Sequence, residues 1–384
     1  MKRILGTLAI AAVVVATPAY ATNGMRLTGF GPVQQSMGGA SVGAPLDAVS
    51  GVTNPAGLSL IKPEFDFAGA AFMPSVKYTA GQGTMSDTSS RPTDFLPTLA
   101  AAFRANDQFT VGVAALGTAG MGVTYDQGLG GLETKTSYMN GRIAPAVAYK
   151  VNDQFSVGAA LNLMYAQMDF AVGGTAPSAA NSFGYGATLG VTYKPTDIVT
   201  IGAAFETEGY FQDFSFDVGG GQTIKIKMDS PMIATLGLGV TPAKGLVLAV
   251  DGEWINWSAT NGKDKPEVSP AGGMAFNMNW KDQLVLKVGA QYALDALKLR
   301  AGFNYGQSPV DQGQSLEALL FPAIAQMHYT LGAGYDISSW TVNASFMYSP
   351  EAKASGTGTT PFGPLDYETK MSQMEFQLGA AVRF

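Results

Sequence analysis

The chain contains no cysteine, so no disulfide can hold it together, and its fold must depend on packing and hydrogen bonds alone. Charged residues are also scarce. They make up 14% of the sequence, whereas a typical soluble domain carries about 25%. After the N-terminal segment, no run reaches the roughly 18 uninterrupted apolar residues that indicate a transmembrane helix. The net charge of −6 argues against nucleic acid as a partner.

The first residues have the layout of a secretory signal peptide. Lys2 and Arg3 give a basic start, Ile4–Ala16 form an apolar run, and Ala19–Ala21 match a small-residue cleavage site. The alternative is an uncleaved membrane anchor, but the apolar run is too short to cross a bilayer. We therefore expect residues 1–21 to be removed after export.

What the sequence does contain is a repeated hairpin pattern, in which a short polar turn leads into a strand of alternating apolar and small or polar residues. The clearest copies are Arg104–Leu116, Lys150–Leu163, Lys194–Phe205, Thr241–Trp254, Ala293–Tyr305 and Asp336–Tyr348. These hairpins give twelve strands between residues 94 and 350, and Glu64–Tyr78 and Tyr367–Phe384 bring the total to fourteen. Exported, poorly charged and rich in glycine and aromatic residues, the chain is predicted to be an all-β protein, a transmembrane antiparallel β-barrel over residues 63–384.

The alternation also predicts which face meets lipid. Lys287 lies between Leu286 and Val288, and Arg300 follows Leu299, so the charges oppose the bulky apolar face. A Lys or Arg facing lipid at mid-depth costs roughly 2–4 kcal/mol, so the apolar face must point outward. A soluble β-sandwich, the alternative, would turn its large residues inward. We expect a barrel in the outer membrane of a Gram-negative bacterium, with both termini on the periplasmic side and short outer loops.

Residues 22–62 have no clean strand alternation and many small residues. A fourteen-stranded barrel is wide enough to need a filler, so this segment is predicted to be a hatch (plug) in the lumen. A periplasmic tail is the alternative. Within it, Asn54-Pro55-Ala56-Gly57 favours a turn.

Two N-terminal runs, Gly29–Ala40 (GFGPVQQSMGGA) and Asp47–Leu58 (DAVSGVTNPAGL), resemble the hatch of the FadL/TodX family. The likeness continues in Glu253–Ser258 and in Asn279–Val310. Members of that family are outer-membrane transporters of long-chain fatty acids and hydrocarbons. The resemblance implies passive uptake through the barrel, with a hatch rearrangement and a lateral exit at a kink in the third strand. It implies no enzyme activity and no cofactor. The sequence departs from the fatty-acid members in its shorter outer loops.

The upper part of the third strand, Leu116–Tyr125 (LGTAGMGVTY), independently offers a place for a lateral gate. Glycine weakens strands and proline lacks the N–H that a ladder needs. The candidate gate residues on this strand and its two neighbours are Gly117, Gly120, Gly122, Pro97 and Pro145. The alternative is that they merely relieve curvature.

Five lumen residues are candidates for binding substrate. Arg142, Lys287 and Arg300 point inward by parity and could hold a substrate carboxylate. The alternative is that they pair with lumen acids such as Glu253 or Glu375. Met164 and Leu116 add apolar surface to the same face.

Two other functions compete with uptake of hydrophobic compounds. An enzyme is disfavoured because the single histidine, His328, has no nucleophile motif beside it, and no metal-ligand cluster is apparent. A general or polar-solute porin would need rows of lumen charge, which are few here. We expect a monomer whose partners are a hydrophobic small molecule, membrane lipid, and the barrel-assembly machinery through its terminal Phe384.

Overall fold

The computed structural model describes residues 23–128, 131–171, 178–217, 223–262, 278–360 and 363–384. The predicted signal peptide, residues 1–21, lies outside the described residues. Among the described residues, no helix has the length and apolar character of a membrane-crossing helix.

A single antiparallel sheet closes on itself because β1 pairs with β18 from Glu64–Arg383 to Ala80–Tyr367. Of its sixteen strands, β2 (Met85–Thr88) and β9 (Tyr210–Phe211) are short extensions. The other fourteen make the barrel wall, which confirms the predicted count. They are β1 Glu64–Ala80, β3 Asp94–Arg104, β4 Phe109–Tyr125, β5 Thr134–Lys150, β6 Phe155–Ala171, β7 Ser178–Thr196, β8 Val199–Glu206, β12 Ile233–Ala243, β13 Leu246–Ile255, β14 Gln283–Leu294, β15 Leu297–Gly306, β16 Met327–Ile337, β17 Trp340–Thr360 and β18 Gly363–Arg383.

The outer face of the barrel is apolar, as the alternation predicted. Leu286 and Leu299 are exposed on the outside, whereas Lys287 and Arg300 are buried. Exposed aromatic residues form a ring at each end of this face, as in outer-membrane barrels. One ring, beside the short turns, includes Phe103, Phe109, Tyr193, Tyr292, Tyr335 and Trp340; the other includes Phe95, Tyr165, Phe183, Tyr185, Tyr329 and Tyr348.

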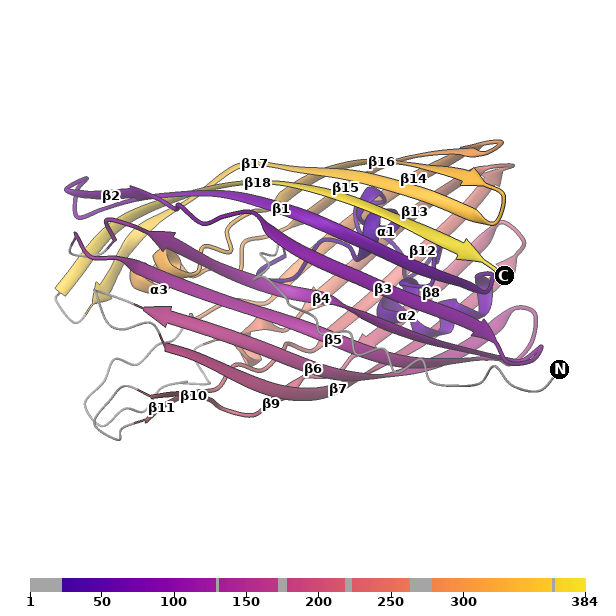
Figure 1. The fold of residues 1–384 in the computed structure, drawn as a ribbon, viewed down its shortest axis with the longest axis horizontal. Coiled ribbons are helices and arrows are strands. Elements are labelled where there is room, and N and C mark those ends of the chain that lie inside the picture. Colours follow the sequence, from indigo (N-terminus) through magenta and orange to yellow (C-terminus); the bar gives the residue numbers. More distant parts are fainter. Residues whose placement is uncertain (1–22, 129–130, 172–177, 218–222, 263–277, 361–362) are drawn as a thin grey trace.

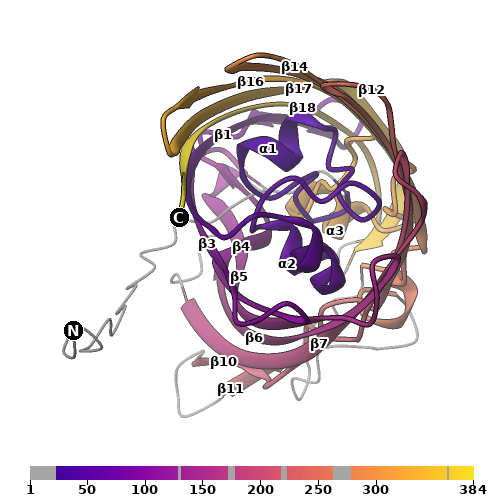
Figure 2. The ribbon, with the colours of Figure 1, turned by 90° about the vertical axis from the view of Figure 1, so that its right-hand side faces the viewer.

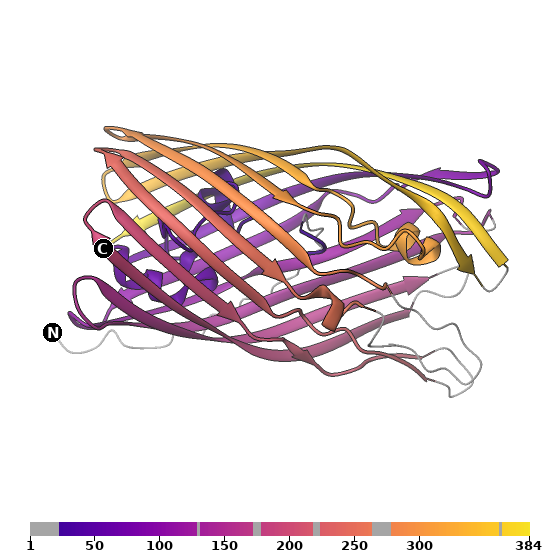
Figure 3. The same ribbon diagram turned by 180° about the vertical axis from the view of Figure 1, so that it is seen from behind.

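The wall is not equally tall all round (Figures 1 and 3). β17 and β18 each contain 21 residues, whereas β8 contains only 8. Because β8 ends at Glu206 and β12 begins at Ile233, the outer connection between them spans residues 207–232. The expectation of short outer loops is therefore wrong here. The segment includes the hairpin strand β10 (Phe214–Asp217), which pairs with β11 (Thr223–Ile226).

The N-terminal segment lies inside the ring of strands, as Figure 2 shows. It contains α1 (Gly31–Ser36), α2 (Ser50–Thr53) and the 3-10 helix η1 (Pro55–Leu60). The ring also encloses α3 (Ser315–Leu320), toward the other end, and η3 is a short turn at Trp257–Ala259. The main apolar core therefore lies in the lumen, between the N-terminal segment and the extracellular end.

Candidate functional site

The Asn54 turn joins the N-terminal segment, called the hatch below, to the barrel wall. Asn54 is fully buried, and its Nδ2 donates to the carbonyls of Val42 and Val191, at 3.1 Å each. Its Oδ1 accepts from the N–H of Ala56 at 3.2 Å, and Pro55 follows at the first position of η1. Asparagine and then proline is the order that a helix start favours. The predicted turn residues thus form a docking point for the hatch.

Glycines on the inner face of the wall let the hatch backbone come close. A Cβ at Gly158 of β6 would collide with Ala56, and one at Gly190 of β7 would collide with Asn54. Gly57 itself has the Pro45 ring 2.9 Å from where its own Cβ would lie. Glycine inside a strand often marks such a close backbone approach.

Asp251 of β13 provides a second docking point, which the sequence analysis did not single out. Its Oδ2 accepts from the N–H groups of Ser41 and Val42, at 2.7 and 2.9 Å, and its Oδ1 accepts from Gly43 at 3.4 Å. Successive backbone N–H groups form a natural site for an anion. The sequence feature that could have revealed this docking point is an inward-facing aspartate in a barrel that encloses a glycine-rich segment.

A third docking point is acidic. The N–H of Ala48 donates to Glu64 at 3.1 Å and to Asp66 at 2.9 Å, both on β1. Asp47 accepts hydrogen bonds from the N–H and the hydroxyl of Ser50, the first residue of α2. Burial first, and then the negative charge of Glu64, raise the pKa of Asp47 to about 7.

The hatch also completes the wall beside β4. Pairing of β3 with β4 ends at Thr98–Leu116, and the register of β4 with β5 shifts between Gly117 and Ala119. Beyond that point the hatch replaces β3. The N–H of Leu27 donates to the carbonyl of Thr118 at 3.2 Å, and the N–H of Gly120 donates to the carbonyl of Met25 at 2.8 Å.

The five predicted gate residues surround this irregular part of the wall. Gly117 and Gly120 flank the register shift, and Gly122 has a φ of 143°, which only glycine adopts readily. Pro97 lies opposite Gly69 on β1, and Pro145 opposite Val113 on β4. Both prolines are on the strands that adjoin β4: Pro97 comes directly beyond the last β3–β4 pair, level with the shift, and Pro145 lies below it.

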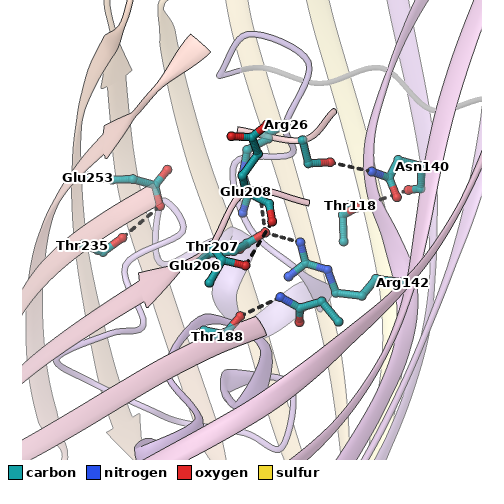
Figure 4. Close-up of polar contacts among 12 residues, drawn as sticks. Arg26, Thr118, Asn140, Arg142, Thr188, Glu206, Thr207, Glu208, Thr235 and Glu253 are labelled. Carbon is teal, nitrogen blue, oxygen red and sulfur yellow. Dashed lines mark hydrogen bonds and ion pairs between the residues drawn. The ribbon is translucent and has the colours of Figure 1, made fainter. Parts of the chain in front are cut away.

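Buried charges link the hatch, β5 and β8 (Figure 4). Glu206, the last residue of β8, pairs with Arg26 of the hatch at 3.4 Å and with Arg142 of β5. Nearby, Lys287 pairs with Glu253 at 2.8 Å. The cavity lined by Arg26, Glu206, Glu253 and Lys287 has a volume of about 20 Å³.

These pairs separate the three predicted basic residues. Lys287 is paired with Glu253, one of the two lumen acids that the sequence analysis gave as alternative partners. Arg300 lies at a different cavity, lined also by Asp47, and donates to Gln291 at 2.7 Å and to Asn343 at 3.0 Å. Arg142 keeps two buried nitrogens, Nε and Nη1, without a hydrogen-bond partner among the described residues. The three do not form one site.

Arg142 borders the apolar lumen. Met164 is its partner in the β5–β6 register, and Leu116 is its partner in the β4–β5 register. Leu116 and Met164 are each 3% exposed and belong to one apolar cluster with Met121 and Phe211. The predicted apolar pair is thus brought together with one of the three predicted cations.

His328 is fully buried, with Nδ1 3.4 Å from Oδ1 of Asn304. Within the described parts of the chain, no three His, Asp or Glu side chains gather as metal ligands. Glu375, the other acid named as an alternative partner for the cations, accepts a hydrogen bond from Gln377 at 2.6 Å.

Residues 8–384 match the family model described as outer membrane protein transport protein (OMPP1/FadL/TodX). The chain belongs to this family. It is therefore an outer-membrane transport protein, and the predicted resemblance is confirmed. No match is found among curated proteins.

Solved structures show the same fold. A Pseudomonas aeruginosa FadL homologue has a TM-score of 0.79 at 19% identity, covering 94% of this chain and 100% of its own. The P. putida toluene transporter TodX gives 0.74 at 19% identity, covering 93% and 99%. The Ralstonia pickettii toluene transporter TbuX gives 0.70 at 18% identity, also covering 93% and 99%.

Proposed function

We propose that this transport protein is a channel for passive uptake of hydrophobic compounds, either long-chain fatty acids or aromatic and aliphatic hydrocarbons. Two features found together carry the proposal. The lumen is apolar, with Leu116 and Met164 at its base, and the wall beside β4 is completed by the hatch and not by another strand. The family and the relatives named toluene transporters support the same substrate class.

The route has three steps. A substrate displaces apolar contacts in the lumen and occupies the cluster above Arg142. The hatch segment Met25–Leu27 then leaves the edge of β4. Gly117, Gly120 and Gly122 leave the wall thin at that level, with Pro97 and Pro145 on the adjoining strands, so the substrate exits sideways. The hatch, residues 22–62, acts as the plug, and the barrel, residues 63–384, as the wall.

Arg142 is the best of the three cations as a head-group anchor. One of its nitrogens pairs with Glu206, whereas the other two, Nε and Nη1, are buried and have no hydrogen-bond partner among the described residues. A substrate carboxylate would accept hydrogen bonds from these two buried nitrogens. Arg142, Leu116 and Met164 thus form the proposed binding site, while Lys287 and Arg300 support the lumen structure.

A polar-solute porin fits less well, because the hatch and apolar side chains occupy the lumen. The test is liposome swelling with sugars set against uptake of a labelled fatty acid and of an alkylbenzene. We expect uptake of the hydrophobic probes without swelling. Swelling by sugars, without hydrophobic uptake, would establish the porin instead.

We propose further that the chain works as a monomer. We also propose that Phe384, which ends the chain just after β18 and is exposed, is read by the barrel-assembly machinery.

A further inference from the structure

The connection between β15 and β16, residues 307–326, turns into the barrel instead of projecting outward. We call it the α3 loop. Leu319, Leu320, Phe321 and Ile324 are each 1–2% exposed, which is unusual for a connection at the water-facing end of a barrel. In Figure 2, α3 lies within the ring of strands, beyond α1 and α2.

The α3 loop packs on two apolar clusters. Leu320 and Phe321 belong to the lumen cluster that contains Leu116 and Met164. Leu319 and Ile324 belong to a second cluster, made with the extracellular ends of β1, β4, β17 and β18 (Val76, Tyr78, Ala80, Val123, Tyr125, Ala354, Tyr367 and Met371). The loop therefore lies between the outside and the proposed binding site.

Two hydroxyl groups hold the C-terminal end of α3. The hydroxyl of Tyr125 on β4 donates to the carbonyl of Leu319 at 3.2 Å. Oγ1 of Thr136 on β5 donates to the carbonyl of Leu320 at 2.6 Å and accepts from the N–H of Val123. Carbonyls in the last turn of a helix lack partners within the helix, so hydroxyls at this place fix where the helix ends.

β4 and β5 are the strands that carry the register shift at Gly117–Ala119. Gly122, with its positive φ, lies between that shift and Tyr125 on the same strand. A movement of the upper part of β4 would therefore act on both the α3 loop and the edge that Met25–Leu27 completes.

We propose that the α3 loop is a lid over the extracellular entrance, and that Tyr125 and Thr136 are positioning residues that latch it shut. The proposal rests on the uptake route described above, whose entrance it defines. The lid stays closed in water because opening exposes four apolar side chains, and it opens when an apolar substrate replaces their contacts. Since the latch is on the gate strands, entry is coupled to lateral exit.

The absence of cysteine makes a direct test possible. Ser315, the first residue of α3, is 1% exposed, and its hydroxyl has no partner among the described residues. Ser315→Cys is therefore a small change that reports whether the lid is open. Labelling with a membrane-impermeant maleimide in intact cells should be slow, and it should become faster on addition of toluene.

The latch is tested in the Ser315→Cys background. Tyr125→Phe with Thr136→Val removes both hydroxyls and should speed labelling roughly thirtyfold, since two hydrogen bonds of about 1 kcal/mol each are lost. At position 136 alone, Thr136→Val should speed labelling, whereas Thr136→Ser keeps the hydroxyl and should label as slowly as the parent Ser315→Cys protein. The matched control is Tyr78→Phe with Thr134→Val, whose hydroxyls donate to Gln127 and Leu132, not to α3.

The outcomes separate this proposal from the uptake function. Equal labelling of latch and control variants, with all barrels folded by their heat-modifiable migration on gels, would overturn the latch. Labelling that does not respond to toluene would overturn the lid. Faster labelling in a protein that takes up no hydrophobic probe would leave the lid standing and reject the uptake route.

Discussion

The side-chain amide of Asn54 donates a hydrogen bond to the carbonyl of Val191 on β7, at 3.1 Å, from a position that is completely buried. The same amide reaches Val42, so one residue fixes the fold of the hatch and its place on the wall. Asn54→Ala should weaken hatch docking by roughly 1–2 kcal/mol, since it removes a cap and leaves buried carbonyls without donors.

Hydrogen exchange measures this effect. Peptides covering residues 41–61 should exchange faster in the Asn54→Ala variant, while peptides from β17 and β18 stay protected. The control is Asn106→Ala, which removes a turn asparagine on the outside of the barrel that bonds Gln108 and Phe109. Loss of protection in β17 and β18 as well would mean that the whole barrel, not the hatch, depends on Asn54.

Substitution of a glycine on the inner face of the wall is expected to change the permeability of the barrel. Gly190→Val places a side chain where Asn54 lies, so the hatch should be displaced and ion conductance in planar bilayers should rise. Gly252→Val is the matched control, because a Cβ at this exposed position on β13 meets nothing within 4 Å. Equal conductance of the two variants would contradict the idea that the hatch closes the pore.

The gate is tested at Gly120, whose N–H bonds Met25. Gly120→Leu keeps that N–H but fills the wall with a side chain, so uptake of hydrophobic probes should fall several-fold while the barrel remains folded. Gly69→Leu on β1 is the control, because a Cβ at this exposed glycine meets nothing within 4 Å. Undiminished uptake by the Gly120 variant would favour the reading that these glycines only relieve curvature.

Arg142 separates the two substrate classes. Arg142→Met should lower fatty-acid affinity roughly 10- to 100-fold, as expected from loss of a hydrogen bond to a charged group, and leave alkylbenzene uptake near the wild-type value. Arg104→Met, at the exposed last residue of β3, controls for loss of one charge. Equal losses for both probes would show that Arg142 supports the lumen structure and not the substrate.

Asp47 predicts a pH dependence. Its pKa in the folded hatch is about 7, against about 4 for an unfolded chain. Between these values the docked hatch holds a proton that the undocked segment has lost, so docking weakens as pH rises from about 4 to about 7. Channel openings should be more frequent at pH 8 than at pH 5, and Asp47→Asn should reduce the difference. No change with pH in the wild-type protein would contradict the assignment.

The barrel could be predicted from sequence because a strand's alternation has a period of two and each charge marks the lumen face. Lys287 between two apolar neighbours decides the orientation of β14 by itself. The predicted strands begin within a few residues of the observed ones. The rise of β17 and β18 above the membrane was missed, since their upper parts carry polar residues on both faces.

The site was less predictable, because its contacts join residues far apart in sequence. Parity placed Arg142, Lys287 and Arg300 inside, but it could not tell which carboxylate each would meet. The proposed lid was not predicted at all. In the sequence Ser315–Leu320 is a short, partly apolar stretch within a connection, and only folding brings Tyr125 and Thr136 to its end.

The hatch has one more consequence, for the order of assembly. Gly38 donates to Thr330, a partner 292 positions away, and Thr28 donates to Met347, 319 positions away. Contacts over such separations form late, because the chain between them must first be ordered. The hatch residues leave the ribosome before the strands that they contact, yet they are among the last to find their partners, and they must wait within reach of a barrel that is still open.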